Sequence, residues 1–280
     1  MAPITLSHEE FLKFREFFYR KTGIQFEDSK RYFVDKRLIE RIEATDSGSF
    51  RNYFITLRFE MNGQELQRLT NLMTVNETYF FREEYQFKCL VTSILPEITA
   101  LRKKQRPIRI WSVPSSSGEE PYSIAMYLLE YWPGINLWDV EIISSDIDTK
   151  IIAQARQGLY SDRSIQHLPK NLLKKYFHHN GKGYQICDDL RQAVEFTTVN
   201  LMKSSDVRGY REFDIIFCRN LLIYFDDLSR RQAAGTFYDA LNPGGFLCLG
   251  HSESMSRVSS LYQVRKFSDA VIYQKSMEAQ

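Results

Sequence analysis

The sequence predicts an α/β domain preceded by an all-helical N-terminal domain. Three observations carry this prediction. The length of 280 residues fits two domains of ordinary size. The first 75 residues repeat apolar side chains at helical spacing and contain no strand signal. From residue 108 onward, short apolar runs alternate with amphipathic segments, which is typical of a parallel sheet with crossover helices.

The N-terminal domain, residues 1–75, is expected to contain four helices. The first has the clearest start, because Ser7 and Glu10 are spaced as a capping box. Gly23 is placed to end it. The remaining helices are predicted at residues 29–44, at 50–59, and from the cap Asn62 to residue 73.

The α/β domain is expected to span residues 76–280, with a linker at 76–107. Its predicted strands are 108–113, 140–145, 194–199, 213–218 and 246–250, and its predicted helices are 119–131, 149–155 and 228–241. The segment Asn242-Pro243-Gly244-Gly245 is expected to close the last helix. Residues 262–274 predict a closing antiparallel hairpin, and the region at about 160–193 predicts a small antiparallel β insertion.

Composition excludes several classes of protein. A net charge of +2 is too small for nucleic-acid binding driven by bulk charge. Four scattered cysteines predict no disulfides, and the histidines and cysteines lack metal-ligand spacing, so no metal is expected. The sequence has no apolar run long enough to span a membrane and no signal-peptide pattern at its start. We therefore expect a cytoplasmic protein that does not insert into membranes.

Ligands of open α/β sheets bind beyond the carboxyl ends of the strands, so these ends are the places to search. The first predicted strand leads into the small-residue turn 113–118 and a helix that begins with Glu119 and Glu120. Two carboxylates there disfavour a phosphate and favour a cationic or zwitterionic ligand. The alternative is an ordinary strand-to-helix turn whose acidic residues are favoured by the helix dipole.

Three further segments place polar residues where a ligand could meet them. Asp146 follows the second strand and is suited to accept the hydroxyls of a ribose, whereas Asp148 is the better helix cap. Arg219 and Asn220 interrupt an apolar run, and they bind either a substrate or each other. The segment 76–83 threads polar residues through aromatic ones at the domain junction, which predicts a pocket or an aromatic hinge with Arg82 in a surface ion pair.

Together, these segments resemble one family. NETYFFRE at 76–83, WSVPSSSGEEPYS at 111–123, SDID at 145–148 and FCRNLLIYF at 217–225 are similar to the signature segments of the bacterial chemotaxis receptor glutamate O-methyltransferases (CheR). The resemblance covers nearly the whole chain. It implies a Rossmann-like, class I methyltransferase that depends on S-adenosylmethionine (SAM). It also implies that the enzyme esterifies glutamates on the cytoplasmic helices of chemotaxis receptors and releases S-adenosylhomocysteine (SAH).

The resemblance also implies a set of site residues. Arg219 and Tyr224 would lie beside the reacting groups, and our hypothesis is that Arg82 or Arg219, with Tyr224, holds the substrate carboxylate in line with the methyl group. Because a glutamate is already ionised at neutral pH, no general base is needed. The expected cofactor-binding residues are Asn76, Thr78, Arg82, Ser115 in the small-residue turn, one of Glu119 and Glu120, Asp146, Asn200, Leu201, Arg219 and Asn220.

The predicted partner is the cytoplasmic domain of methyl-accepting chemotaxis receptors, with the enzyme a monomer recruited to membrane receptor arrays. Lys30, Arg37 and Arg41 form a basic stripe that could dock the acidic face of receptor helices; the alternative is a solvated surface, because acidic residues interleave with the stripe. The short turn of the β insertion favours engagement without a receptor tether. Two other functions remain open: methylation of another substrate by the same fold, and a non-catalytic scaffold that binds the cofactor.

Overall fold

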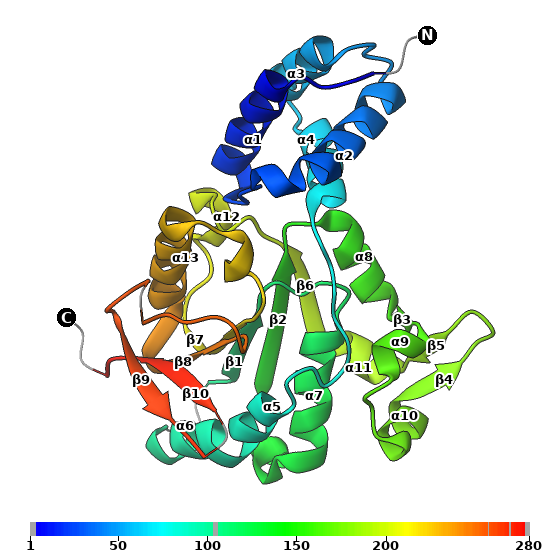
Figure 1. The fold of residues 1–280 in the computed structure, drawn as a ribbon. Coiled ribbons are helices and arrows are strands. Elements are labelled where there is room, and N and C mark those ends of the chain that lie inside the picture. The colour runs from blue at the N-terminus through cyan, green and yellow to red at the C-terminus, as the bar shows by residue number, and fades with distance from the viewer. Residues whose placement is uncertain (1–3, 103–105, 257, 269, 278–280) are drawn as a thin grey trace.

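The computed structural model describes residues 4–102, 106–256, 258–268 and 270–277. The helical domain stands on one end of the α/β domain, as Figure 1 shows in blue and cyan above the sheet. Its helices are α1 (His8–Thr22), α2 (Arg31–Ala44), α3 (Phe50–Phe59) and α4 (Gln64–Met73), with a 3₁₀ turn, η1 (Asp28–Lys30), before α2.

The local signals at the first helix are confirmed. Ser7 Oγ accepts the backbone N–H of Glu10, and the Glu10 carboxylate accepts the backbone N–H of Ser7, which is the predicted capping box. Gly23 ends α1 in the left-handed conformation with φ of 74°. The predicted cap at Asn62 is wrong by one residue, because Gly63 takes that position and Asn62 instead accepts the Gln64 N–H with its side chain.

A seven-stranded sheet forms the centre of the α/β domain, in the order β6-β2-β1-β7-β8-β10-β9. The first five of these strands run parallel, and β10 and β9 form the predicted antiparallel hairpin. Strand order reverses between β1 and β7, which is where open α/β sheets bind ligands. The strands are β1 (Ile108–Ser112), β2 (Val140–Asp146), β6 (Val194–Thr198), β7 (Phe213–Cys218), β8 (Leu241–Leu249), β9 (Tyr262–Lys266) and β10 (Val271–Lys275).

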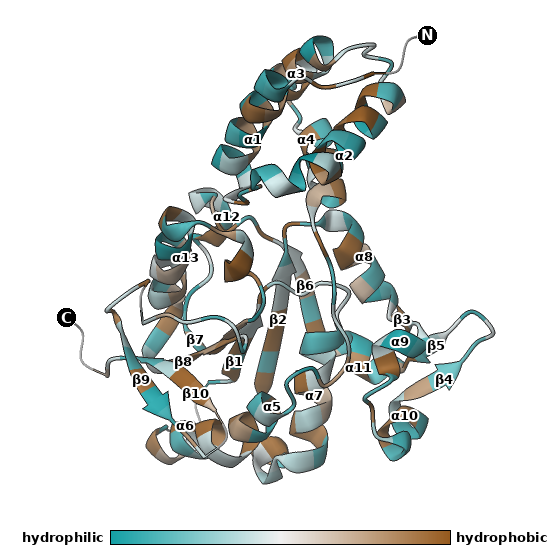
Figure 2. Cartoon of the chain, viewed as in Figure 1, coloured by the Kyte–Doolittle hydropathy of each residue, from teal (hydrophilic) through white to brown (hydrophobic). Residues whose placement is uncertain are grey.

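Helices cover both faces of this sheet. Alternate residues of β7 point to opposite faces: Ile215 and Phe217 join one buried cluster, and Ile216 and Cys218 join the other. Figure 2 shows hydrophobic residues along the strands between these helix layers. The helices are α5 (Tyr85–Cys89), the π-turn η2 (Leu90–Ile94), α6 (Leu95–Leu101), α7 (Glu119–Tyr131), η3 (Pro133–Asn136), α8 (Thr149–Gln157), α11 (Asp188–Gln192), α12 (Ser204–Val207), η4 (Leu222–Tyr224) and α13 (Asp227–Ala240).

One boundary differs clearly from the prediction. The segment 242–245 was expected to close a helix, but it belongs to β8, which begins at Leu241. The strand extends this far because Leu241 pairs with Phe213 across an irregularity in the ladder. The Asn242 side chain also donates to the Asp214 carboxylate of the neighbouring strand at 2.7 Å. Turn-forming residues therefore lie within an irregular strand start rather than ending a helix.

The small antiparallel insertion is confirmed. It is a three-stranded sheet in the order β3-β5-β4. It projects to one side of the main sheet in Figure 1. Its elements are β3 (Leu159–Tyr160), α9 (Asp162–Ile165), α10 (Lys170–Tyr176), β4 (Phe177–His179) and β5 (Tyr184–Ile186). Within the described parts of the chain, we find no helix with the length and apolar character needed to cross a bilayer.

The helical domain shares its core with the sheet. Phe11, Phe14 and Phe18 of α1 are fully buried and belong to the same hydrophobic cluster as Trp111 of β1 and Phe237 of α13. An apolar cluster that runs through both domains fixes the helical domain against the carboxyl ends of the strands, where the candidate site lies.

Candidate active site

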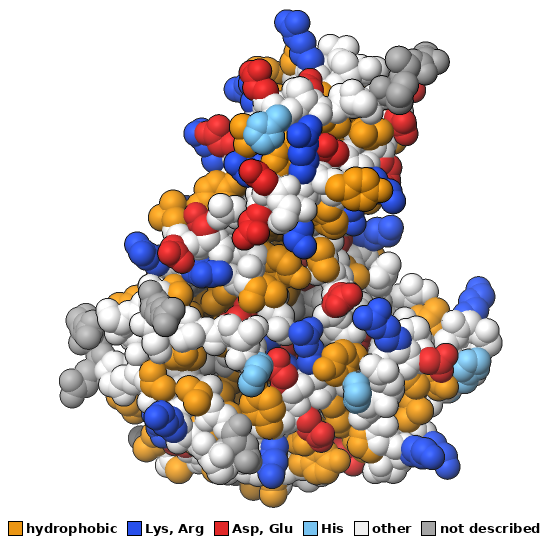
Figure 3. Space-filling view, in the orientation of Figure 1, with side chains coloured by type: hydrophobic (Ala, Val, Ile, Leu, Met, Phe, Trp, Pro, Cys, Tyr) orange, Lys and Arg blue, Asp and Glu red, His pale blue; other side chains and the backbone are white. Residues whose placement is uncertain are grey.

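Two adjoining cavities lie between the helical domain and the carboxyl ends of the parallel strands. The larger has a volume of about 250 Å³ and the smaller about 230 Å³. Figure 3 shows hydrophobic side chains gathered where the two domains meet. The two cavities share part of their walls, and we refer to them together as the cleft. The shared residues are Val75, Asn76, Pro114, Asn220 and Tyr224.

The larger cavity has apolar walls from both domains. The α/β domain contributes Ile147, Val199 and Leu201, and the helical domain contributes residues from α1, the segment after it, η1, α2 and α4. A flat apolar ring such as an adenine would be covered on both sides in such a site. The sequence interpretation missed this helical wall, which consists of Thr22, Ile24, Gln25, Phe26, Lys30, Phe33 and Met73.

Asp146 is the buried carboxylate of the larger cavity. It is 3% exposed, and its Oδ2 accepts the Ser116 N–H at 2.9 Å while its Oδ1 accepts the Asp148 N–H at 3.0 Å. Each oxygen keeps room for a second donor, which suits the two hydroxyls of a ribose. The predicted division of roles is consistent with this, because Asp148 caps α8 by accepting the N–H groups of Lys150 and Ile151.

The burial of Asp146 predicts a pH-dependent affinity. Burial raises the pKa of Asp146 to about 6, although backbone N–H groups oppose the shift. Hydroxyl donors favour the ionised form, so protonation competes with a ribose-bearing ligand. We expect the Kd for SAH, measured by calorimetry, to be constant above about pH 7 and to rise by up to about tenfold per pH unit below about pH 6. Asp146→Asn should remove this slope, and a wild-type Kd that stays constant down to pH 5 would contradict the assignment.

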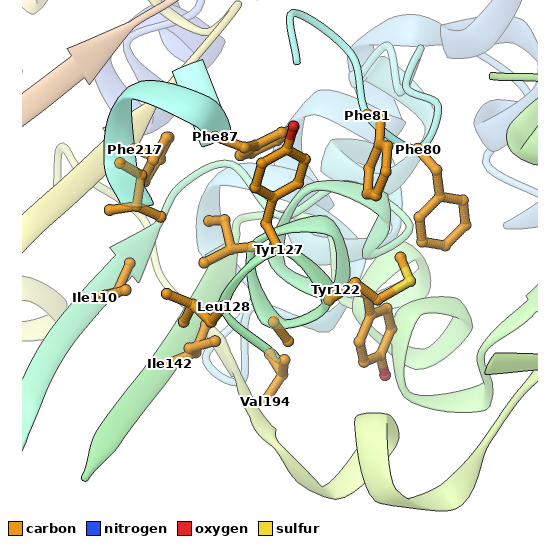
Figure 4. Close-up of a cluster of buried hydrophobic side chains, with 14 of the residues drawn as sticks. Phe80, Phe81, Phe87, Ile110, Tyr122, Tyr127, Leu128, Ile142, Val194 and Phe217 are labelled. Carbon is orange, nitrogen blue, oxygen red and sulfur yellow. The ribbon is translucent and has the colours of Figure 1, made fainter. Parts of the chain in front are cut away.

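The linker between the domains is anchored by aromatic side chains. Phe80 is fully buried and packs edge-on against Tyr160, and the Phe81 ring packs edge-on against Tyr127 of α7. Figure 4 shows Phe81 and Phe87 beside Tyr127 in this cluster. The anchored linker brings three predicted residues to the smaller cavity, and these are Asn76, Thr78 and Arg82.

Backbone strain is concentrated around the smaller cavity. Phe81 and Glu83, which flank Arg82, have φ values of 59° and 53°, and the cavity-lining Ser116 and Asn220 have φ values of 47° and 58°. Such conformations cost free energy in non-glycine residues and persist only where the surroundings hold them. Their position here indicates that the fold fixes the residues of this cavity in one arrangement.

Arg219 is a buried cation on the wall of the smaller cavity. Its Nη1 donates to the Glu120 carboxylate at 3.0 Å, its Nη2 lies 3.4 Å from the Glu83 carboxylate, and the same Nη2 donates to the backbone carbonyl of Arg82. Burial raises the pKa of Glu120, and Arg219 opposes that shift. Arg219 therefore holds the linker and two carboxylates in place rather than pairing with Asn220, the alternative that the sequence left open.

The structure shows which of the two adjacent glutamates lines the cleft. Glu120 lines the smaller cavity, and Ser112 donates to it at 2.9 Å. Glu119 is 2% exposed, accepts the Ser117 hydroxyl at 2.6 Å and lines neither cavity. The geometry therefore places Glu120 at the cleft. Ser115 is fully buried and lines the smaller cavity, and its N–H is held by the Ser145 carbonyl.

Asn200 and Leu201 line the larger cavity, where they were expected. Both ends of the Asn200 side-chain amide have a partner, because Nδ2 donates to the Lys21 carbonyl at 2.6 Å and Oδ1 accepts the Met202 N–H at 2.9 Å. Asn200 thus fastens the end of α1 to this wall of the cavity. The Leu201 side chain supplies apolar surface there.

Arg82 and Tyr224 both line the smaller cavity. Arg82 is partly exposed, donates to the Glu77 carbonyl at 2.9 Å and lies over the Tyr79 ring. Tyr224 is 37% exposed and lines both cavities, and within the described residues its hydroxyl makes no hydrogen bond. These two side chains are available to an incoming polar group, in contrast to the buried Arg219.

The three residues of the predicted basic stripe have different surroundings in the structure. Lys30 is exposed and lines the larger cavity. Arg37 donates to the Leu72 carbonyl at 2.6 Å and lies over the Phe33 ring. Arg41 makes two hydrogen bonds to the buried Glu65 carboxylate, at 2.8 and 2.7 Å. Arg37 and Arg41 thus have partners inside the helical domain, and their docking role stays a prediction.

Arg41 is therefore expected to stabilise the helical domain. Its removal would leave the Glu65 carboxylate, whose side chain is 4% exposed, with only Tyr53 and the exposed Arg68 beside it. We expect Arg41→Ala to lower the free energy of unfolding by about 3–5 kcal/mol, measured by urea denaturation. The control Arg20→Ala, which removes an exposed helical ion pair with Glu16, should cost at most about 0.5 kcal/mol. Equal losses in the two variants would contradict this role of Arg41.

The residues of the cleft match the chemistry of SAM. The nucleoside part needs a hydroxyl acceptor and apolar cover, which Asp146 and the walls of the larger cavity supply. The amino-acid part and the sulfonium need polar groups and negative charge, and Glu120 and Asn76 line the smaller cavity. The Asn76 amide is held by the Asp148 carboxylate at 3.1 Å, so the linker and the α8 cap support each other.

Comparison with known proteins gives a single assignment. Residues 9–74 match the family described as "CheR methyltransferase, all-alpha domain" and residues 76–271 match "CheR methyltransferase, SAM binding domain". "Chemotaxis protein methyltransferase 2" of Vibrio cholerae serotype O1 is 55% identical over 98% of this chain and 96% of its own length. "Chemotaxis protein methyltransferase" of Salmonella typhimurium is 36% identical over 95% of this chain and 88% of its own length. The chain therefore belongs to the CheR family of SAM-dependent chemotaxis methyltransferases.

Proposed function

We propose that this chemotaxis methyltransferase esterifies glutamate side chains on the cytoplasmic helices of chemoreceptors, giving glutamate methyl esters and SAH. Family membership supports the proposal, as do the relatives named as chemotaxis protein methyltransferases. The observation that carries the residue assignment is the juxtaposition of two unlike cavities, one with Asp146 and apolar walls and the other with Arg82 and Tyr224 at its side.

In this proposal the larger cavity holds the nucleoside and the smaller cavity holds the methionine part. Asp146 accepts hydrogen bonds from the ribose hydroxyls, and Leu201 covers the adenine beside the backbone of Asn200. The polar contacts to the methionine part come from Asn76, Thr78, Arg82, Ser115, Glu120 and Asn220. Glu119 is left out of this set because it lines neither cavity.

Methyl transfer to a glutamate carboxylate depends on the orientation of the reacting groups more than on acid–base catalysis. When bound, SAM supplies an electrophilic methyl group on a positively charged sulfur. The Arg82 guanidinium offers charge-assisted hydrogen bonds to the substrate carboxylate, and the Tyr224 hydroxyl offers a second donor. Together they hold one carboxylate oxygen in line for displacement. A glutamate with an ordinary pKa of about 4.3 is already ionised, so the protein needs no general base.

Arg219 has a supporting role in this proposal. Because its Nη1 and Nη2 are engaged with Glu120, Glu83 and the Arg82 carbonyl, it fixes the position of the linker that carries Arg82. Glu120 in turn keeps negative charge beside the smaller cavity, where a sulfonium and an ammonium group would lie.

Docking of the receptor is proposed on the side of the cleft formed by the helical domain. Lys30 is exposed at the mouth of the larger cavity and is the residue of the basic stripe best placed to meet an acidic helix. We propose a cytoplasmic monomer that is recruited to membrane receptor arrays without a tether.

The function is tested with SAM labelled on the methyl group and membranes that contain chemoreceptors. We expect wild-type protein to place base-labile label on the receptors, as a methyl ester requires. Arg82→Ala is expected to lower kcat/KM by about 10- to 100-fold, and Tyr224→Phe by about tenfold, because each removes a hydrogen bond to a charged group.

The matched control is Arg163→Ala. Arg163 is an exposed arginine on α9 that pairs with Glu77 at 3.7 Å, so its loss should leave kcat/KM unchanged. Wild-type kcat/KM in both Arg82→Ala and Tyr224→Phe would exclude their role. Label that enters RNA or a small molecule but not the receptors would favour a different substrate, and SAH binding with no transfer at all would favour a scaffold.

A further inference from the structure

Glu253, in the loop after β8, joins two loops at the edge of the cleft. Its Oε2 accepts the backbone N–H of Asn220 at 2.8 Å and the backbone N–H of Gly250 at 2.9 Å. The first N–H belongs to the loop after β7 and the second to the loop after β8. One carboxylate oxygen therefore fixes the distance between the ends of two neighbouring strands.

The Asn220 backbone needs such support. Its φ of 58° lies in the left-handed region, which costs free energy for a residue other than glycine. The segment that follows Asn220 is the short 3₁₀ turn η4 (Leu222–Tyr224). Burial raises the pKa of Glu253, and the N–H groups of Leu222 and Ile223, with those of Asn220 and Gly250, oppose that shift. The carboxylate thus lies at the start of this turn as well as against Asn220.

The surroundings of Gly250 give independent evidence that the loops after β7 and β8 pack closely against each other. A Cβ at this position would lie 2.8 Å from Glu253 Oε2 and 3.0 Å from the backbone nitrogen of Asn220. The first distance is shorter than real Cβ contacts, so the Glu253 carboxylate would have to move, and the second is tight enough that the Asn220 backbone would have to give way slightly. A side chain at position 250 would therefore push the Glu253 carboxylate away from its place against Asn220.

We infer that Glu253 is a positioning residue for methyl transfer, which holds the segment 220–224 so that Asn220 and Tyr224 face the cleft. Glu253 lines neither cavity, whereas Asn220 and Tyr224 line both. It acts through the hydrogen bonds that its Oε2 accepts from the backbone N–H groups of Asn220 and Gly250. The inference rests on the proposed role of Tyr224 in orienting the substrate carboxylate.

The test compares Glu253→Ala, Glu253→Gln and Gly250→Ala with wild-type protein in the receptor methylation assay. Glu253→Ala is expected to lower kcat by about 100-fold, the order of loss caused by misplacing a reacting group by about 1 Å, and to change the KM for receptor by less than about threefold. Gly250→Ala should behave in the same way. Glu253→Gln keeps one oxygen that can accept both N–H groups, so its kcat should stay within about tenfold of wild type.

The control variant is Asp214→Ala. Asp214 is a buried carboxylate at the opposite end of β7, where it accepts the Arg109 N–H and pairs with Arg102 at 2.8 Å. Its loss should destabilise the same strand without moving the cleft, so kcat measured well below the unfolding temperature should stay near wild type. A kcat for Glu253→Ala no lower than that of Asp214→Ala would overturn the inference, as would a Glu253→Gln variant as slow as Glu253→Ala.

Amide hydrogen exchange supplies a readout that does not depend on the substrate. The Asn220 N–H should exchange at least about tenfold faster in Glu253→Ala than in wild type and should be unchanged in Asp214→Ala. Unchanged exchange in Glu253→Ala would overturn the inference. If the wild-type protein does not methylate receptors, the proposed function is wrong. The exchange of the Asn220 N–H would still show whether Glu253 holds the backbone of the loop after β7.

Discussion

Replacing Asp146 with alanine is expected to weaken SAH binding by roughly 100-fold to 10⁴-fold. In the proposed binding mode, the variant removes two hydrogen bonds from ribose hydroxyls to a charged acceptor, each of which contributes about 1.5–3 kcal/mol. It also leaves the N–H groups of Ser116 and Asp148 without their carboxylate partner. Calorimetry with SAH measures the affinity, and circular dichroism shows whether the variant has folded.

A matched control for this variant lies just before the same strand. Asp139 is an exposed acid just before β2, at the end of the strand far from the cleft, and Asp139→Ala should bind SAH as wild type does. Asp146→Asn keeps the size of the side chain and should lose less affinity than Asp146→Ala. If Asp146→Ala folds and its Kd lies within about threefold of wild type, the nucleoside does not bind at Asp146.

Arg219→Ala is expected to combine a large loss of stability with a large loss of activity. Arg219 has a side chain only 2% exposed, and its removal leaves the part-buried Glu120 and Glu83 without their cation. Breaking a buried pair from one side costs about 3–5 kcal/mol. The linker also loses the donor to the Arg82 carbonyl, so we expect kcat/KM to fall by about 100-fold or more even in the folded fraction.

A variant of a second arginine, Arg102, distinguishes the loss of stability from the loss of activity. Arg102 has a side chain 12% exposed and pairs with Asp214 at the end of β7 opposite the cleft. Arg102→Ala should therefore lose comparable stability in urea denaturation while keeping wild-type kcat/KM per folded molecule. If Arg219→Ala also keeps wild-type kcat/KM once the folded fraction is counted, Arg219 serves stability alone.

Signals between residues close in the chain were enough to predict most of the fold. The capping box at Ser7, the glycine end of α1 and the apolar strands each depend on local pattern, and they are confirmed within about two residues. The start of β8 was wrong because its pairing with Phe213 outweighs the turn-forming residues Pro243 and Gly244. Local propensity gives way where a distant strand supplies the partner.

The parts of the site that were missed depend on contacts between residues far apart in sequence. The helical wall of the larger cavity forms because α1 packs near β7 and α13. No pattern within the sequence of α1 predicts this packing. The partner of Arg41 is Glu65, from a different helix, so the helix that carries the basic stripe could not reveal that this arginine is engaged. Similarly, Glu253 gains its role only when the loops after β7 and β8 come together.

The segment after α1 runs beside the segment that ends η4. Ile24 forms an antiparallel bridge with Phe225, and the Gln25 N–H donates to the Tyr224 carbonyl at 3.1 Å. A force applied to the helical domain would reach the backbone of Tyr224 through these two pairings. If the proposed role of Tyr224 holds, a receptor helix that tilts the helical domain on arrival would also shift this tyrosine, which would link recognition of the substrate to the geometry of transfer.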